Sequence, residues 1–256
     1  MISIKELEKK LLHSHDTNQE MLDMLRNDKR KGVQRILKRY ETMKNKQIAL
    51  EEMHAQMTEY ENNLRKKGNR NIAGLDEVGR GPLAGPVVAA AVVLPAEFKL
   101  LGLTDSKKLS KDRREDFYEV IKEEAVAYSI QMVHAFHIDE INIYESTKLA
   151  MSRAVKDLKC DLDHLLLDAI TLDVSIEQTS IIKGDQKSIS IAASSILAKV
   201  TRDRYMDEVD KRFPGYGFSN HVGYGTKEHL EALSKLGITR EHRRSFKPIK
   251  GSILVT

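Results

Sequence analysis

Four acidic residues stand where apolar runs of the sequence end. They are Asp76, Glu77, Asp168 and Asp185, which follow the runs IAGL, HLLL and SIIKG. Carboxylate oxygens suit Mg²⁺ or Mn²⁺, ions that few carboxylates hold and that complete their shells with water and substrate phosphate. One such acid alone is usually a cap or half of an ion pair. Three strand ends that each deliver a carboxylate favour a metal site.

Such a set of acids could hydrolyse a phosphodiester, a reaction that needs an activated water and a stabilised leaving oxygen. Two divalent ions about 4 Å apart can supply both. Four carboxylates would offset the charge of these ions and leave coordination positions for the scissile phosphate. We expect this chemistry to use no protein nucleophile and to leave 5′-phosphate and 3′-hydroxyl ends.

The two adjacent acids pose a geometric problem. Neighbours on an ideal strand face opposite sides of a sheet, so Asp76 and Glu77 can share a site only if the strand ends or twists there. Gly79 and Gly81 permit such a change of direction.

The same glycines suggest an alternative, a dinucleotide-binding turn. Gly79, Gly81 and Ala84 match G-x-G-x-x-A, and Asp105 lies where the acid for the ribose is expected. That turn requires a helix directly after the glycines, whereas VVAAAVVLP predicts a strand. The acids before the glycines would also repel a phosphate unless a cation intervened. The alternative is therefore rejected.

The elements that must position the acids belong to a chain of 256 residues, of which 41% are hydrophobic and 31% charged. No apolar run approaches the roughly 20 residues that cross a bilayer, and the charged N-terminus does not resemble a secretory signal. A single cysteine, Cys160, suits a reducing compartment. We expect a cytoplasmic protein without a membrane segment.

Residues 1–68 are predicted to form a helical, basic N-terminal extension. Up to residue 67 they contain no proline, and residues 1–70 hold 16 basic and 11 acidic side chains. Ser3 and Glu6 fit a capping box, and an apolar face recurs at helical spacing from Val33 to Tyr40. We expect helix to continue toward Leu64. Composition leaves three roles open: a partner helix, a dimerisation arm and a nucleic-acid clamp.

Residues 71–256 are predicted to form an α/β domain. Five runs read as strands: NIAGLDEVG, VVAAAVVLP, AVAYSIQMV, HLLLDA and SIEQTSIIKGD. Helical stretches lie between and after them, including DRREDFYEVIKEE, IYESTKLAMSRAVKDL and ISIAASSILAKVTRDRYMDEVDKRF. Strands in hairpins followed by strands that alternate with helices predict a mixed five-stranded sheet flanked by helices.

Several motifs resemble bacterial ribonuclease HII over about residues 72–247. They are GLDEVGRGPLAGPVVAAAV, DSKKLS, IAASSILAKVTRD, GYGFSNHVGYGTKEH and HRRSF, in this order. The related ribonuclease HIII typically has a lysine between the first two motif glycines and a glutamate as its fourth acid. Arg80 and Asp185 occupy these positions here, so the resemblance is to ribonuclease HII.

The resemblance implies an RNase H-like fold and an endonuclease that cleaves the RNA strand of RNA–DNA hybrids. It also implies incision 5′ of single ribonucleotides in duplex DNA, with Mn²⁺ or Mg²⁺ as cofactor. The four acids would be both catalytic and metal-binding. Gly79, Arg80 and Gly81 would hold the strand around the ribonucleotide, and Tyr224 would stack at the RNA–DNA junction. We expect a monomer.

Basic residues near these motifs are candidates for phosphate contacts. They are Lys107, Lys187, Lys199 and Arg202. Each one alone is as easily explained as a solvated charge. His221, His229 and His242 could suggest zinc, but their wide spacing without cysteine partners argues against it.

Two other functions stay open on the residues alone. One is a non-catalytic module that binds hybrids or DNA, although a pure binder has no reason to gather negative charge beside phosphate. The other is an RNase H-like exonuclease or nicking DNase, which would not require a 2′-hydroxyl.

Overall fold

The computed structural model describes residues 3–13 and 19–252. It divides into two compact units, Met1–Ala55 and Gln56–Thr256. The division predicted at residues 68–71 stays a prediction of where the functional domains meet. Within the described residues, no helix is long and apolar enough to cross a membrane.

The first unit is helical. It contains α1 (Ile4–His13), α2 (Gln19–Arg26) and most of α3 (Lys31–Met57). The predicted capping box is present: Ser3 Oγ accepts from the Glu6 amide at 3.2 Å, and Glu6 Oε2 accepts from the Ser3 amide at 3.0 Å. Leucines of α1 and α2 pack on Val33 and Leu37 of α3. The helix expected to run to Leu64 is interrupted, and α4 (Glu59–Lys66) follows as a separate helix.

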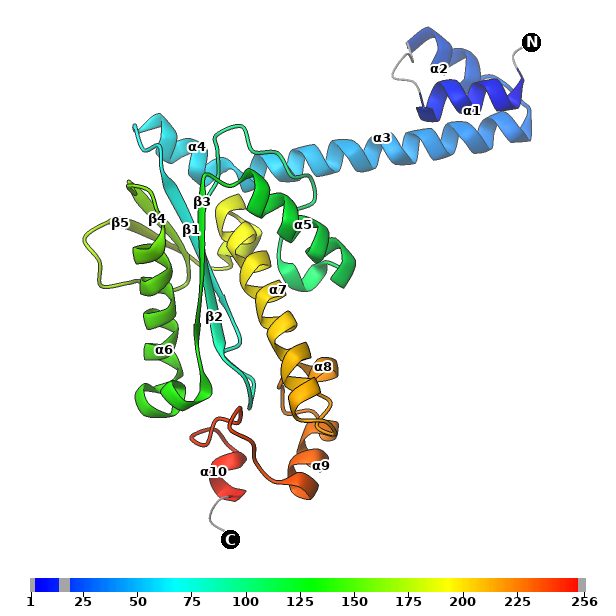
Figure 1. Cartoon of the computed structure of the whole chain (residues 1–256). Helices are drawn as coiled ribbons and strands as arrows, with labels where there is room; N and C mark the ends of the chain where they lie inside the picture. Colours follow the sequence, from blue (N-terminus) through cyan, green and yellow to red (C-terminus); the bar gives the residue numbers. More distant parts are fainter. Residues whose placement is uncertain (1–2, 14–18, 253–256) are drawn as a thin grey trace. The chain divides into compact units, whose positions relative to one another are not determined.

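The second unit is built on one five-stranded sheet (Figure 1). Its strands are β1 (Ile72–Val78), β2 (Val87–Val93), β3 (Ala127–Val133), β4 (His164–Asp168) and β5 (Glu177–Ile181). The order is β3-β2-β1-β4-β5, antiparallel from β3 to β1 and parallel from β1 to β5. The predicted mixed five-stranded sheet is confirmed. The last strand is shorter than its sequence run because Gly184–Gln186 forms a 3₁₀ turn.

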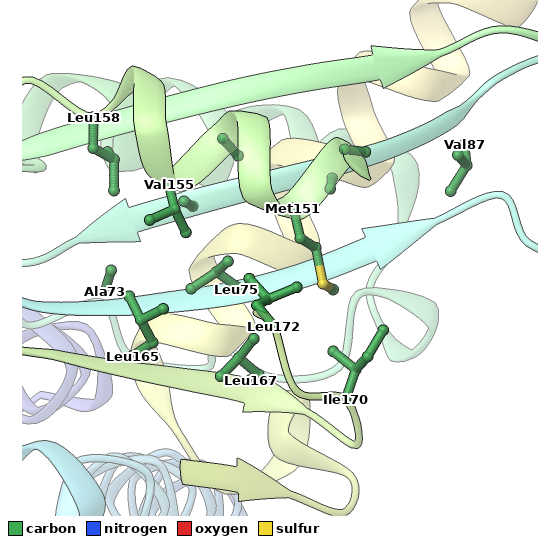
Figure 2. Close-up of a cluster of buried hydrophobic side chains, with 14 of the residues drawn as sticks. Ala73, Leu75, Val87, Met151, Val155, Leu158, Leu165, Leu167, Ile170 and Leu172 are labelled. Atoms are coloured by element: carbon green, nitrogen blue, oxygen red, sulfur yellow. The ribbon is translucent and has the colours of Figure 1, made fainter. Parts of the chain in front are cut away.

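Helices cover both faces of this sheet. The long ones are α5 (Lys111–Glu124), α6 (Ala135–Asp157) and α7 (Ile189–Arg212). Figure 2 shows Met151 and Val155 of α6 packing over Ala73, Leu75 and Leu165. The alternate residues of the same strands, Ile72 and Leu166, pack instead with Ile191 of α7.

The remaining elements are short and mostly lie near the C-terminus. They are α8 (Phe218–His221), α9 (Lys227–Leu236), α10 (Ile249–Ser252) and the 3₁₀ turn Ser106–Lys108. Together with the loops between them, these elements place the tyrosine and histidine motifs beside the end of β1, as the bridge between Ala84 and His242 indicates.

Candidate active site

The four predicted acids lie at one edge of the sheet. Parallel pairing of β1 with β4 brings the carboxyl ends of both strands to the same edge, so Asp76 and Asp168 meet there. Asp185 joins them from the 3₁₀ turn after β5. This turn is tied to β4 because Asp168 Oδ1 accepts a hydrogen bond from the Gly184 amide at 2.9 Å.

The four side chains line one cavity of about 350 Å³. Other residues on its wall are Gly79, Arg80, Gly81, Ser106, Lys107, Ser195, Lys199 and Tyr224. Asp76 lies on the α7 side of the sheet, like Ile72, and alternation would place Glu77 on the other side. Both reach the cavity because β1 ends at Val78, and the Glu77 amide donates to Asp76 Oδ1 at 2.8 Å.

Three of these carboxyl groups are held in surroundings that oppose their ionisation. Burial, and then the charge of Glu77, raise the pKa of Asp76 well above its usual range. Burial raises the pKa of Glu77 to about 7, although Arg80 beside it acts in the opposite direction. Burial and the neighbouring Asp105 and Asp168 raise the pKa of Asp185 to about 6. The site therefore concentrates negative charge that protein cations only partly offset.

This donor set fits hard divalent cations. All four candidate ligands are carboxylates, and a bound cation would offset the cost of burial and the repulsion that raise the pKa values of Asp76, Glu77 and Asp185. No preformed cluster of three or more histidine, cysteine or acidic side chains with metal-site spacing occurs in the part of the chain that the structure describes. The fit to Mg²⁺ or Mn²⁺ therefore rests on the chemistry of the carboxylate oxygens, since these ions take hard oxygen ligands and keep water or phosphate in the remaining positions.

Residues 79–81 after β1, here called the glycine loop, are supported on their interior side by two buried arginines, Arg202 and Arg243. Gly79 has φ of +99°, and a Cβ there would overlap the Arg202 side chain. Arg243 donates from its guanidinium to the carbonyl oxygens of Gly79, Arg80 and Gly85 at 2.6–3.0 Å. Both arginines are fully buried.

Arg202 corrects one sequence expectation. Its guanidinium donates to the carbonyl oxygens of Ala84, Pro86 and Val222 at 2.9–3.1 Å. With its donors directed at these carbonyls and no exposed surface, Arg202 cannot contact phosphate; it joins the glycine loop to the loop that carries Tyr224. The sequence could not separate these roles because both use the same guanidinium donors.

The three candidate lysines are placed differently from one another. Lys107 and Lys199 line the cavity, whereas Lys187 is exposed outside its lining. Lys199 also forms an ion pair with Asp203 at 2.6 Å, and the charge of Lys107 acts to lower the pKa of Asp185.

Tyr224 stands at the rim of the cavity with 45% of its surface exposed. A Cβ added at Gly81 would lie 3.6 Å from its ring, so the ring and the glycine loop face each other closely. The backbone around the ring is fixed by histidines: the Gly223 amide donates to His221 Nδ1, and the Tyr224 carbonyl lies 2.9 Å from His229 Nδ1.

The three histidines gather in the interior although they are far apart in the sequence. The rings of His221 and His229 stack at 4.5 Å, and His229 Nε2 lies 3.1 Å from His242 Nε2. Burial and the neighbouring His229 lower the pKa of His242 to about 4. Because the ring nitrogens of this group are engaged with backbone groups and with each other, the geometry is that of structural support.

The structure also brings to the site several residues that the sequence did not place there. Ser195 of α7 lines the cavity, and its hydrogen bond acts to lower the pKa of Asp76. Asp105, assigned to a ribose in the rejected alternative, lies buried beside Asp185 and accepts from Gln186 at 3.3 Å. Arg243 stands in the HRRSF motif, which was the available signal for its importance.

Comparison with known proteins finds one family over most of the chain. The family model described as Ribonuclease HII matches residues 73–249, and the one described as Ribonuclease HII N-terminal domain matches residues 3–65. Ribonuclease HII of Shouchella clausii (strain KSM-K16) is 57% identical over 249 residues, which cover 97% of this chain and 96% of that protein.

Two solved structures share the fold. Ribonuclease H2 from Pyrococcus horikoshii OT3 has a TM-score of 0.61 and 24% identity, covering 71% of this chain and 96% of the other. Bst-RNase HIII in complex with Mn²⁺ has a TM-score of 0.56 and 16% identity, covering 73% of this chain and 70% of the other.

Proposed function

The chain belongs to the ribonuclease HII family of metal-dependent endonucleases, and we propose that its four-acid cavity is the site of hydrolysis. The substrates are the RNA strand of RNA–DNA hybrids and single ribonucleotides in duplex DNA, which are incised on their 5′ side. The observation that carries this assignment is the convergence of four carboxylates, three with a raised pKa, in one open cavity beside a glycine loop.

Asp76, Glu77, Asp168 and Asp185 are the proposed ligands of Mn²⁺ or Mg²⁺. The ions supply Lewis-acid activation of water and stabilisation of the leaving oxygen when they are bound. Manganese is present in the Bst-RNase HIII structure of the same fold. The products carry 5′-phosphate and 3′-hydroxyl ends.

The glycine loop and Tyr224 form the proposed recognition surface. Distinguishing RNA from DNA requires detection of a 2′-hydroxyl. Gly79 and Gly81 both line the cavity, and the absence of a side chain at Gly81 lets the loop backbone approach a sugar beside the Tyr224 ring. Arg80 is exposed at the rim, where its guanidinium can bind phosphate in a bidentate manner. Tyr224 offers a ring face to the sugar or base at the junction, 3.6 Å from where a Gly81 side chain would begin.

Lys107, Lys187 and Lys199 are the proposed contacts to the phosphate backbone. Contacts of this kind position a nucleic acid without reading its sequence. Replacing all three should weaken duplex binding and flatten its dependence on salt. Lys199 already neutralises Asp203, so its share should be the smallest.

We also propose that the enzyme acts as a monomer in the cytoplasm. The one cysteine, Cys160, is free and half-buried, which suits a reducing compartment. Light scattering coupled to gel filtration should give the mass of one chain; the mass of two would contradict a monomer.

The test of the function is incision of a labelled DNA duplex that contains one ribonucleotide, with Mn²⁺ or Mg²⁺. A matched all-DNA duplex and a chelator serve as controls. We expect one cut 5′ of the ribonucleotide, none in the all-DNA duplex and none with chelator. Cleavage of long hybrids alone would overturn the proposed roles of Arg80 and Tyr224, and cleavage of neither substrate would overturn the function.

A further inference from the structure

Glu61 of α4 is a charged residue with no exposed surface. Its Oε1 accepts a hydrogen bond from Ser188 Oγ at 2.6 Å and another from the Ser190 amide at 3.0 Å. Its Oε2 is buried, and no residue in the described part of the chain forms a hydrogen bond with it. Burying a carboxylate is costly unless its partners hold it well, so the contacts made by Oε1 must be important to the local structure.

Those contacts lie at the first turn of α7, where backbone amides lack partners within the helix. Ser188 is the N-cap, and its hydroxyl accepts from the Ile191 amide at 3.2 Å. Because a hydroxyl has one proton to donate, donation to Glu61 leaves the Ser188 oxygen free to accept from Ile191. Glu61 therefore sets the orientation of the cap and binds a second free amide itself, and its charge suits the positive end of the helix.

The capped turn is continuous with the active site. The amides of Lys187 and Ser188 both donate to the carbonyl of Gly184 at 2.9 Å, and Asp185 lies inside this turn. On the other side, the turn is joined to Asp168 through the Gly184 amide. Fixing Ser188 therefore fixes the segment that presents Asp185.

The same end of α7 also presses on the strand that carries the first two acids. A Cβ at Gly74 would overlap the Ser190 backbone, so α7 meets β1 two residues before Asp76. Farther along the same helix, Ser195 forms a hydrogen bond with Asp76. Through the start of α7, the Glu61 carboxylate is thus connected both to the turn that carries Asp185 and to the strand that carries Asp76.

We propose that Glu61 is a positioning residue of the active site: its hydrogen bonds to Ser188 and Ser190 hold the turn that presents Asp185 and the start of α7. This inference rests on the proposed role of Asp185 in binding metal. Glu61 does not line the cavity. The inference therefore gives α4, which precedes the sheet in the chain, a role in holding the active site.

The test uses the full chain and compares Glu61→Ala, Glu61→Gln and Ser188→Ala with the wild type. Val155→Ala is the matched control, because it removes buried volume on the α6 side of the sheet and should lower the melting temperature without touching α7. Three quantities are measured below the melting temperature of every variant: Mn²⁺ affinity by calorimetry without substrate, hydrogen exchange of residues 184–191, and kcat and KM for incision.

Glu61→Ala should weaken Mn²⁺ binding or lower kcat by about 10- to 100-fold, the usual effect of removing a partner that orients a metal ligand. KM for the duplex should change less than the Mn²⁺ affinity or kcat, since Lys187 is the one proposed phosphate contact in the loosened turn. Residues 184–191 should exchange faster. Glu61→Gln keeps an acceptor oxygen and should restore most of the affinity, and adding Ser188→Ala to Glu61→Ala should cost little more, since both act through one turn.

Unchanged Mn²⁺ affinity, kcat and exchange in Glu61→Ala would overturn the inference, as would effects no larger than those of Val155→Ala. If Glu61→Ala does not fold, Glu61→Gln and Ser188→Ala decide: Ser188→Ala should loosen the turn and Glu61→Gln should preserve it, and the reverse would overturn the inference. A wild type that neither binds Mn²⁺ nor incises would overturn the proposed function, while the exchange data would still report whether Glu61 holds the turn.

Discussion

Two groups of buried or half-buried ionisable side chains lie close together in this molecule, and they differ in their hydrogen-bond partners. The first is the acid cavity, formed by Asp76, Glu77, Asp168 and Asp185. The second, here called the support cluster, consists of Arg202, Arg243, His221, His229 and His242. Burial raises the pKa of acids in the first group and lowers the pKa of bases in the second, because in both it disfavours the charged form.

The difference lies in the partners. Arg243 directs its donors at the carbonyls of Gly79, Arg80 and Gly85, so its charge is buried but solvated by backbone. The acids face a cavity and one another. A side chain whose hydrogen bonds are all made stabilises the fold. Carboxylates that repel one another and line an open cavity instead favour the binding of a cation.

The largest expected effect separates activity from stability. Asp76→Asn should lower incision by about 10³-fold or more, because losing a metal ligand removes several kcal/mol of transition-state stabilisation. The folded-state pKa of Asp76 is raised, so its ionised form disfavours the fold above that pKa. The variant should therefore be at least as stable as the wild type at pH 8, as measured by urea unfolding.

Asp116→Asn, an exposed acid of α5, is the matched control and should change neither quantity. Normal incision by a folded Asp76→Asn protein would remove the basis for treating the acid cavity as the site of chemistry.

The support cluster should respond in the opposite way. Arg243→Met would leave several buried carbonyls without donors and should lower the free energy of unfolding by about 3 kcal/mol. The glycine loop would lose its support, so preference for the ribonucleotide duplex over long hybrids should also decline. Arg244→Met is the control from the same motif, since Arg244 is exposed and should shift stability by about 0.5 kcal/mol at most. Equal stability of the two variants would break the distinction drawn between the groups.

Much of the fold could be predicted because the signals are local. Alternating and continuous apolar runs identified five strands, and their order along the chain indicated a mixed sheet. Helix does reach Leu64, as predicted, but the periodic pattern does not show the break at Thr58 that separates α3 from α4. Asn142 is a second break that the pattern does not show. The helical pattern after Asn142 was recognised, but α6 begins earlier, at Ala135, and its first turns join the rest of the helix through Asn142, which has a φ of 66°.

The acids were predictable and the support cluster was not. Asp76 and Asp168 each follow an apolar strand, so a one-dimensional pattern carries their position. Whether Arg202 faces solvent or the interior depends on carbonyls more than a hundred residues earlier in the chain, at Ala84 and Pro86. No local spacing encodes such a contact, and a buried arginine and a phosphate-binding arginine look alike in sequence.

Stability between pH 7 and pH 5 offers a sharper comparison of the two groups. His242 has a folded-state pKa of about 4, below the unfolded value near 6.5, so the unfolded chain binds the proton first. Its contribution is complete above about pH 6.5 and falls by about 2 kcal/mol as pH drops to 5. The folded-state pKa values of Glu77 and Asp185 are raised above their unfolded values. Their contribution to the free energy of unfolding therefore changes in the opposite direction and is lost as pH rises through about 6 to 7.

His242→Asn isolates the histidine, because the amide oxygen can still accept from the Thr239 amide without titrating. Relative to this variant, the wild type should lose about 2 kcal/mol of unfolding free energy between pH 7 and pH 5. Parallel pH profiles for the two proteins would mean that His242 is protonated in the folded state as easily as in the unfolded chain.

The smallest effect is expected where the two groups meet, at Tyr224. Its backbone is held by His221 and His229, while its ring stands at the rim of the acid cavity. Tyr224→Ala should reduce incision at a single ribonucleotide by about 10-fold, in keeping with about 1–3 kcal/mol for base stacking on an aromatic ring. Tyr224→Phe should retain most activity because the ring face is preserved, and the exposed ring should contribute little to stability. If Tyr224→Ala unfolds more easily yet cuts normally, the ring belongs to the support cluster and the boundary between the two groups lies closer to the acids.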